Sequence, residues 1–591
     1  MSETITHAPG PPVPGPHAPG HHAPGPLPAA TANDPDHRVR TAALERLVGP
    51  ADDPGNPLGT AAVLAADEQG ELSAEGERLL TGYGLNAEFV PRALGGRFTQ
   101  ADGLAHLMRT VFRRDCSLGI GYGVTSFIAG LPVWASGSAA QQRRAADILL
   151  SGGRVVAAYT ELAHGSDFSR VGLTATPAPE GLRLRGGKQL VNNVSRAEAA
   201  VVFARTSDRP GSRSHSHLLV DLDRLPADAV RRDIRYPTSG VRGCLLGGIE
   251  FDDCPVPADS VLGTPGDAME TVLRAFQVTR SVLPGMVVGI GDTQVRAALG
   301  FGLGRHLYGR PVARLPYPRA TLVGAFADLL VSDALATVGA RSLHLLPGET
   351  SVQSAAVKYL VPKLLQESSY RLSVLLGARS YVRTGPYAVF QKAARDLPVV
   401  ALAHAGSAVC QATIVPQLPR LADRGWFRPG TEAPAELFRP GDPLPPLDLA
   451  RLELNSRGRD TLSRAVTDTE YDDPRVNALA RLFAGELRGI ARRAAELPPR
   501  DRTVLASRRG FLLADRYAHV LAAAACLGVW RHGDGPRRDP AWVICALHRL
   551  ADRLGLKPGP LPRDAAEELH TELLHRHEEH LTFDLIRAPL A

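Results

Sequence analysis

The stretch FDDCPVPADSVLG, residues Phe251 to Gly263, lies at the end of a segment that has its own sequence pattern. Alternating apolar and polar residues, many of them β-branched, recur in GLRLRGGKQLVNN, AEAAVVFARTS, HSHLLVDLD and GGIEFDDCPV. This period of two is typical of β-strands, and turn sequences such as RPGS and LPAD separate the runs. Residues 158–266 are therefore predicted to form a small antiparallel β-domain, a barrel or a sandwich.

Helical periodicity dominates on both sides of this segment. In ADGLAHLMRTVFRR, residues 101–114, apolar side chains recur at three- and four-residue spacing. Ser138 is a good N-cap for the helix predicted after it, and Pro284 is a candidate kink in a later apolar-periodic run. The predicted units are a Pro/Gly/His-rich tail that stays unfolded (1–38), an N-terminal helical domain (39–157), the β-domain (158–266), a second helical domain (267–422), a proline-rich connector (423–449) and an appended helical region (450–591).

Composition excludes several classes of protein. The 591 residues carry a net charge of +6, but the basic residues are spread out and form no stripe with aromatics, so we expect no nucleic-acid partner. Six cysteines without a CxxC pair predict neither a disulfide framework nor a metal site. We find no signal peptide and no apolar run of the roughly 18 residues that a membrane span needs. The expected location is the cytoplasm.

Three stretches together resemble the acyl-CoA dehydrogenase family, which includes the acyl-CoA oxidases. They are AAYTELAHGSD (157–167), FDDCPVPADSVLG (251–263), and TRSVLPGMVVGIG with GRHLYGRPV (279–312). The resemblance covers about residues 50–420. It implies an α+β multidomain fold with an N-terminal helical domain, a central antiparallel β-barrel and a C-terminal four-helix bundle. The residues after the connector are similar in position and class to the extra helical domain of the longer oxidases.

The resemblance also implies FAD and the α,β-oxidation of an acyl thioester, carried on coenzyme A or on a carrier protein. Thr160 corresponds to a threonine that hydrogen-bonds the flavin ring, and Ser166 to a serine near the FAD and the coenzyme A moiety. Leu190 stands where the family has a tryptophan beside the flavin, and Asn192 where it has a threonine. An asparagine still offers a donor and an acceptor, so flavin binding is compatible with both departures.

Four further residues have family counterparts at the cofactor or the substrate. Arg305 in GRHLYG resembles an arginine that reaches the FAD pyrophosphate across a dimer interface, and Tyr308 an aromatic near the adenine. Gly377 matches the first glycine of a GG turn whose second glycine is an alanine here. Arg280 matches an arginine near the substrate or a buried carboxylate. These matches imply a homodimer or a homotetramer.

The position of the catalytic base is the main departure from the family. The family's glutamate lies eight residues after an RD pair, which reaches His404, or Ala405 with a one-residue shift. The other known position corresponds to Thr279, which cannot act as a base. A neutral imidazole can take the proton, so His404 is one candidate base. The alternatives are a flavin-dependent monooxygenase or oxidase of the same fold, or a non-catalytic flavoprotein-like scaffold. The electron acceptor is oxygen or an electron-transfer flavoprotein.

Overall fold

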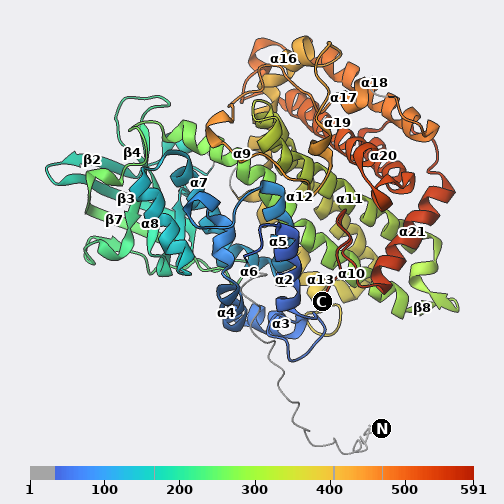
Figure 1. The fold of residues 1–591 in the computed structure, drawn as a ribbon, viewed down its shortest axis with the longest axis horizontal. Helices are drawn as coiled ribbons and strands as arrows, with labels where there is room; N and C mark the ends of the chain where they lie inside the picture. The colour runs from blue at the N-terminus through green and yellow to red at the C-terminus, as the bar shows by residue number, and fades with distance from the viewer. Residues whose placement is uncertain (1–32, 166, 404–405, 469) are drawn as a thin grey trace, which may run out of the picture.

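The computed structural model describes residues 33–165, 167–403, 406–468 and 470–591 (Figure 1). Three of the predicted features therefore lie outside the described residues. They are most of the tail, Ser166, and the pair His404 and Ala405.

The first helices pack around one central helix. α5 (Ala101–Arg114) is buried along its whole length, its arginines included, and packs against α2, α9 and α10. The predicted helix is confirmed, but it is buried on all sides and does not lie at the surface with one apolar face. Ser138 caps the last of these helices through a full capping box with Gln141. The other helices of this part are α2 (His37–Val48), α3 (Thr60–Gln69), α4 (Ala74–Tyr83), α6 (Cys116–Gly119), α7 (Thr125–Ser136) and α8 (Ala139–Leu150).

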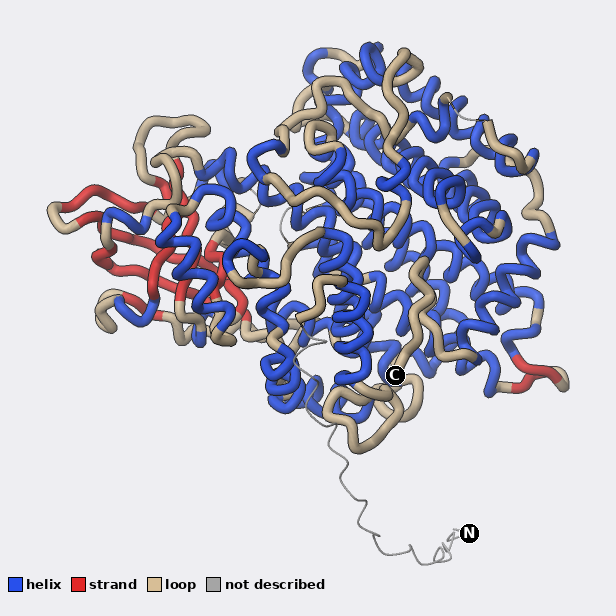
Figure 2. The backbone as a smooth tube through the Cα atoms, viewed as in Figure 1, coloured by secondary structure: helices blue, strands red, loops and turns tan. Residues whose placement is uncertain are grey.

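The strands form one curled, open sheet at one end of the molecule (Figure 2). The order is β1-β4-β2-β3-β7-β6, with β5 paired to β4. The predicted antiparallel β-barrel is confirmed in part: the sheet is curled and most of its strand pairs are antiparallel, but the path does not close, and β1 and β4 run parallel. Parallel neighbours need a long crossover, which the β2–β3 hairpin supplies here. The strands are β1 (Val155–Ala158), β2 (Thr174–Ala178), β3 (Gly181–Asn192), β4 (Ala199–Arg205), β5 (His215–Asp221), β6 (Val230–Arg231) and β7 (Leu246–Val256).

Four long helices follow the sheet and pack on one another: α9 (Ala268–Met286), α10 (Val288–Gly304), α11 (Pro316–Leu345) and α12 (Thr350–Leu376). Pro284 lies two residues before α9 ends. Between α10 and α11 a short hairpin, β8 (His306–Leu307) and β9 (Arg310–Pro311), projects from the body (Figure 2). The next helices are α13 (Ala388–Asp396), α14 (Val399–Leu402), α15 (Ser407–Ile414) and α16 (Leu418–Arg420).

Of the remaining helices, α19, α20 and α21 pack along α11, while α17 and α18 pack on α19, as the orange and red ribbons of Figure 1 show. Asp328 on α11 is fully buried and accepts hydrogen bonds from Arg549 and Arg553 of α20. Burial alone would raise the pKa of Asp328, but the two guanidiniums lower it to about 2. A buried ion-pair cluster therefore joins α20 to α11. The helices are α17 (Arg464–Thr467), α18 (Pro474–Ala495), α19 (Arg508–His532), α20 (Pro540–Leu554) and α21 (Arg563–Glu578).

Within the described part of the chain, four helical stretches have the length and hydropathy of a membrane span, which corrects the expectation that no apolar run is long enough. In three of them the apolar window is 94%, 100% and 83% buried inside the protein. These are Cys116–Ser136, Pro316–Leu345 and Arg508–His532. The fourth, Ala388–Gly425, is 25% buried and runs over residues outside the description. Long apolar runs arise in three of these places because the helices lie in the protein interior.

Candidate functional site

The ends of β1 and β3 meet the start of α7, and hydrogen bonds tie the three together. The carbonyl of Thr160 accepts from the Gln189 amide at 2.8 Å. Asn192, the last residue of β3, donates through Nδ2 to the Ile120 carbonyl at 3.1 Å and to Thr125 Oγ1 at 2.8 Å. Ile120 begins a π-helical turn, η3 (Ile120–Val124), and such turns frequently mark functional sites. We call this junction the strand-end site.

One polar atom of the strand-end site is left without a partner. Asn192 is 5% exposed, and within the described chain its Oδ1 has no hydrogen-bond donor. A buried acceptor without a donor costs about 1–3 kcal/mol, and native proteins rarely leave one unused. Asn192 Oδ1 is therefore a candidate contact for a ligand that brings an N–H or an O–H.

Apolar side chains border the same site. A β-bulge between Lys188 and Val191 puts Leu190 at φ +55°, and its side chain is 37% exposed. Leu162 is 58% exposed, and its amide donates to Gln189 Oε1 at 3.1 Å. The two leucines thus flank one polar residue at the surface, an arrangement suited to covering part of a flat apolar ring.

A buried ion pair holds the loop after Thr160 against β3. Lys188 Nζ lies 2.8 Å from Glu161 Oε1, and the lysine is fully buried. The carboxylate also accepts from the amides of Gly172 and Leu173. Burial would raise the pKa of Glu161, but Lys188 and the two amides outweigh it and lower the pKa. Sequence analysis missed this pair, although both residues stand inside the motifs TELAHGSD and GGKQLVNN.

A second polar cluster lies between α9, α12 and α15. Arg280 is 4% exposed, its Nε has no hydrogen-bond partner in the described chain, and its guanidinium lies over the Phe276 ring. Lys358 Nζ donates to the carbonyl of Val400. Burial lowers the pKa of Lys358 to about 8; Cys410 opposes the shift and Arg280 adds to it. Lys358 therefore anchors α14, which ends two residues before position 404.

The other predicted cofactor residues lie elsewhere in the chain. Arg305 adjoins the β8–β9 hairpin, and Tyr308 at its tip is 90% exposed with φ +52°. Figure 1 places this hairpin at the opposite end of the molecule from the sheet. Gly377 ends α12 at φ +58°, where a side chain would be strained. The structure therefore ties Thr160 by its backbone to β3, the strand that carries Leu190 and Asn192, and it does not bring Arg305 or Tyr308 to them.

The buried amine of Lys358 predicts a distinctive pH dependence of stability. In the folded state the group loses its proton near pH 8, whereas in the unfolded chain it does so near its ordinary value of about 10.4. Because the unfolded state binds more protons in between, the folded state gains stability as pH rises through this window. Relative to Lys358→Met, we expect wild type to gain roughly 3 kcal/mol between pH 8 and 10.4, at about 1.36 kcal/mol per pKa unit.

Urea denaturation at several pH values measures this effect, and Lys557→Met, which removes an exposed amine, is the matched control. If the wild-type and Lys358→Met stabilities change in parallel with pH, Lys358 is not the source of the dependence.

Comparison with known proteins supports the resemblance. The model "Acyl-CoA dehydrogenase, middle domain" matches residues 156–254. The human mitochondrial short-chain specific acyl-CoA dehydrogenase is 26% identical over 321 residues, 54% of this chain and 77% of that protein. A glutaryl-coenzyme A dehydrogenase in complex with glutaryl-CoA has a TM-score of 0.58 at 20% identity, covering 67% of this chain and 98% of that one. The FAD complex of PigA has a TM-score of 0.58 at 16% identity, covering 65% and 97%. Residues 156–254 thus match an acyl-CoA dehydrogenase middle domain, and the chain is similar to an acyl-CoA dehydrogenase over about half of its length.

Proposed function

We propose that this protein is an FAD-dependent oxidoreductase that oxidises the α,β carbon–carbon bond of an acyl thioester. The observation that carries the proposal is the buried, unpartnered Oδ1 of Asn192 at the strand-end site, inside the matched middle domain. The human relative is named an acyl-CoA dehydrogenase, one structural neighbour holds FAD and another holds glutaryl-CoA. The carrier of the acyl group is coenzyme A or a carrier protein.

The residues of the strand-end site fit a flavin. Asn192 Oδ1 is an acceptor, and an isoalloxazine carries an N3–H while its ribityl chain carries hydroxyls. Thr160 adds a hydroxyl at the end of β1, and the exposed Leu190 can cover an edge of the ring. Bound FAD supplies the hydride acceptor for the carbon β to the thioester carbonyl. Ser166 completes the predicted set at the coenzyme A side.

The chain's own residues handle the proton. His404 is our candidate base, whose neutral imidazole takes the proton from the carbon next to the thioester carbonyl. Lys358 bonds to Val400 and so holds α14, the described helix that precedes position 404 in the sequence. Arg280, buried nearby with an unpartnered Nε, is the candidate substrate contact.

The assembly, the partners and the location are part of the proposal. The exposed Tyr308 and the adjoining Arg305, with Gly377, are suited to serve the flavin of a second copy, in a homodimer or homotetramer. Oxygen or an electron-transfer flavoprotein accepts the electrons, and oxygen would make the protein an acyl-CoA oxidase. We expect a cytoplasmic protein with no membrane span and no nucleic-acid partner. The chain is divided into the six units predicted from the sequence, of which residues 267–422 form a four-helix bundle.

An anaerobic titration of the purified protein tests the proposal. Wild type is expected to bind FAD and to lose its yellow colour with at least one member of an acyl-CoA panel. Asn192→Ala is expected to bind FAD about 10-fold more weakly, since one hydrogen bond is worth about 1.4 kcal/mol. Asn455→Ala, which alters an exposed asparagine, serves as the control. Wild-type protein that binds no flavin would refute the proposal.

One observation favours a second function. Thr279, at the alternative base position, is 2% exposed and donates its hydroxyl to the Phe276 carbonyl, so no carboxylate stands there. A site without a carboxylate base suits a flavin-dependent monooxygenase, or a flavoprotein that serves as a scaffold. Bound FAD that no acyl thioester bleaches would favour these alternatives.

A further inference from the structure

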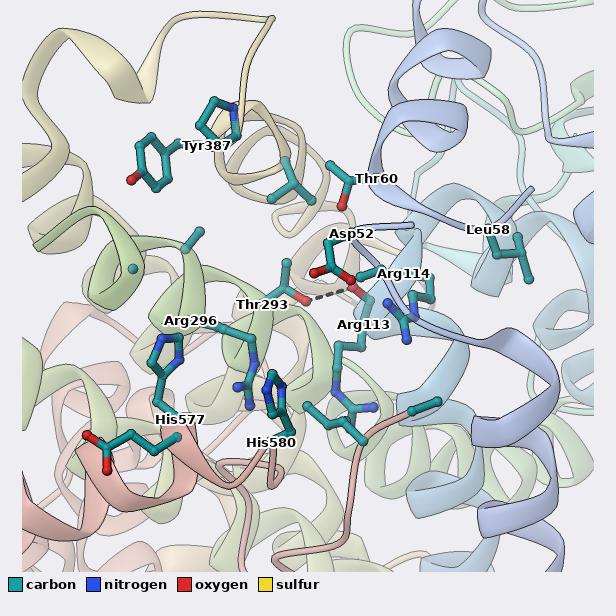
Figure 3. Close-up of a pocket in the computed structure, with 18 residues that line it drawn as sticks. Asp52, Leu58, Thr60, Arg113, Arg114, Thr293, Arg296, Tyr387, His577 and His580 are labelled. Atoms are coloured by element: carbon teal, nitrogen blue, oxygen red, sulfur yellow. Dashed lines mark hydrogen bonds between the residues drawn. The ribbon is translucent and has the colours of Figure 1, made fainter. Parts of the chain in front are cut away.

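A cavity of about 510 Å³ opens between parts of the chain that are far apart in sequence (Figure 3). Its walls come from the segment 51–60, the end of α5, the middle of α10, the start of α13 and the end of α21 with the residues after it. None of the strand-end residues lines it. We call it the arginine cavity, after the three arginines in its wall: Arg113, Arg114 and Arg296.

Two of these arginines are the last residues of α5 and share one carboxylate. Each is 9% exposed. Arg113 Nη1 donates to Glu45 Oε2 at 3.0 Å, while Arg114 Nη2 lies 3.5 Å from Glu45 Oε1 and donates to the Gly49 carbonyl at 2.5 Å. Within the described chain, Nε of Arg114 has no hydrogen-bond partner. Arg114 thus has one full hydrogen bond, to a neutral carbonyl, and a loose ion pair.

The third arginine enters from α10. Arg296 Nη2 donates to Asp292 Oδ1 at 3.2 Å and to the Leu581 carbonyl at 2.7 Å, and the guanidinium lies 4.2 Å from the centre of the Phe583 ring. Its Nε is buried and lacks a partner among the described residues. Figure 3 shows Arg296 and Arg114 on opposite sides of the cavity, with Arg113 between them.

Charge in the wall is not balanced at its buried end. The three guanidiniums have two buried carboxylates as ion-pair partners, Glu45 and Asp292. A third buried carboxylate, Asp584, also acts on Arg113, but it is paired with Arg109. The other acidic side chains of the wall, those of Asp52 and Glu578, are exposed, where water screens them. Burial lowers the pKa of Arg114 to about 10, although Glu45 and Asp52 act against it. A buried guanidinium whose charge is not fully compensated is stabilised by a further anion.

The remaining wall combines further donors with apolar surface. His577 and His580 line the lower side in Figure 3, and Thr60 and Tyr387 the upper side. Apolar atoms come from Leu58, Ala297, Val389 and Leu590. Burial, with Arg296 and His580 adding to it, lowers the pKa of His577, which fits a site of positive potential. A cavity of this size accommodates a small organic molecule rather than an ion alone.

We propose that the arginine cavity binds a small organic oxyanion, a phosphate ester or carboxylate with an apolar or aromatic body. Arg114 and Arg296 hold the anionic end from opposite sides, through their guanidinium groups in the cavity wall. The body of the ligand lies against the Tyr387 ring and the apolar wall. This site is separate from the flavin chemistry.

Thermal shift and calorimetry on the full-length protein test the site with phenyl phosphate, benzoate, inorganic phosphate and, as a neutral control, benzyl alcohol. A ligand that binds only the folded state raises Tm. We expect phenyl phosphate or benzoate to raise Tm and benzyl alcohol to have no effect. The affinity should fall at least 10-fold in Arg114→Met and in Arg296→Met. Arg424→Met, at an exposed arginine outside the cavity, should bind like wild type.

A second variant keeps the test independent of arginine's role in folding. Gly300 lies in α10 and lines the cavity, and a Cβ added there meets no atom within 4 Å. Gly300→Phe should therefore fold, fill the cavity and abolish anion binding while FAD content stays the same. Equal binding in Gly300→Phe and wild type, or no Tm shift with any of the three anions, would overturn the proposal. Preferential binding of phenyl phosphate or of benzoate identifies the class of oxyanion. If inorganic phosphate binds and neither organic anion does, the proposal of an organic ligand is refuted.

Discussion

Replacing Arg109 by methionine is expected to lower the free energy of unfolding by about 3–5 kcal/mol, the cost of breaking a buried ion pair. Arg109 is 1% exposed and contacts three other parts of the chain. Its Nε donates to the Gly285 carbonyl at 2.8 Å, Nη2 to Asp333 at 2.5 Å and Nη1 to Asp584 at 3.0 Å. Methionine fills similar volume, so the loss arises from two carboxylates left buried without a cation.

Urea denaturation followed by circular dichroism measures this loss. Arg424→Met, which removes an exposed arginine, should change stability by less than about 0.5 kcal/mol. Arg109→Lys separates charge from geometry, because an ammonium cannot reproduce the three directed contacts of the planar fork. We expect it to fall between wild type and Arg109→Met. A loss below about 1 kcal/mol in Arg109→Met would mean that the two acids find other partners or become protonated.

Replacing His404 by alanine is expected to lower the rate of flavin reduction by an acyl thioester about 10²- to 10⁴-fold, the usual contribution of a general base. FAD binding should be unchanged, so the flavin spectrum of the variant should match wild type. An imidazole acts as a base only when neutral, so the wild-type rate should fall below about pH 6–7. In His404→Ala this fall in rate at low pH should be absent.

Anaerobic stopped-flow measurements give both the rate of flavin reduction and its dependence on pH. Added imidazole should restore part of the rate in His404→Ala if the defect is the missing base. His575→Ala, at an exposed histidine of α21, is the matched control and should reduce normally. A His404→Ala variant that reduces as fast as wild type would remove this residue from the mechanism and favour the monooxygenase or scaffold alternative.

Local patterns predicted the local structure well. The apolar spacing in residues 101–114 predicted a helix, and Ser138 predicted a helix start; both are confirmed. The alternating runs predicted strands, but alternation says nothing about which strands become neighbours. The parallel β1–β4 pair and the open edge of the sheet therefore could not be read from the sequence.

The candidate site was predictable only where its residues lie in recognisable motifs. Thr160, Leu190 and Asn192 stand in two such motifs, and a backbone hydrogen bond joins Thr160 to β3, which carries the other two. Lys358 lies in a long apolar helix, where one lysine resembles any surface lysine in sequence, and only packing shows that it is buried. The arginine cavity likewise joins residues from both ends of the chain, and no local pattern links them.

The contact between Arg109 and Asp584 spans 475 positions, so it constrains how the nascent chain matures. To reach Asp584 a ribosome adds 475 residues after Arg109, so the guanidinium is made long before its carboxylate partner. The central helix α5 therefore cannot reach its final, charge-neutralised packing until Asp584 has been made. We expect the late intermediate to expose apolar surface and to depend on chaperones, as large proteins with incomplete packing commonly do.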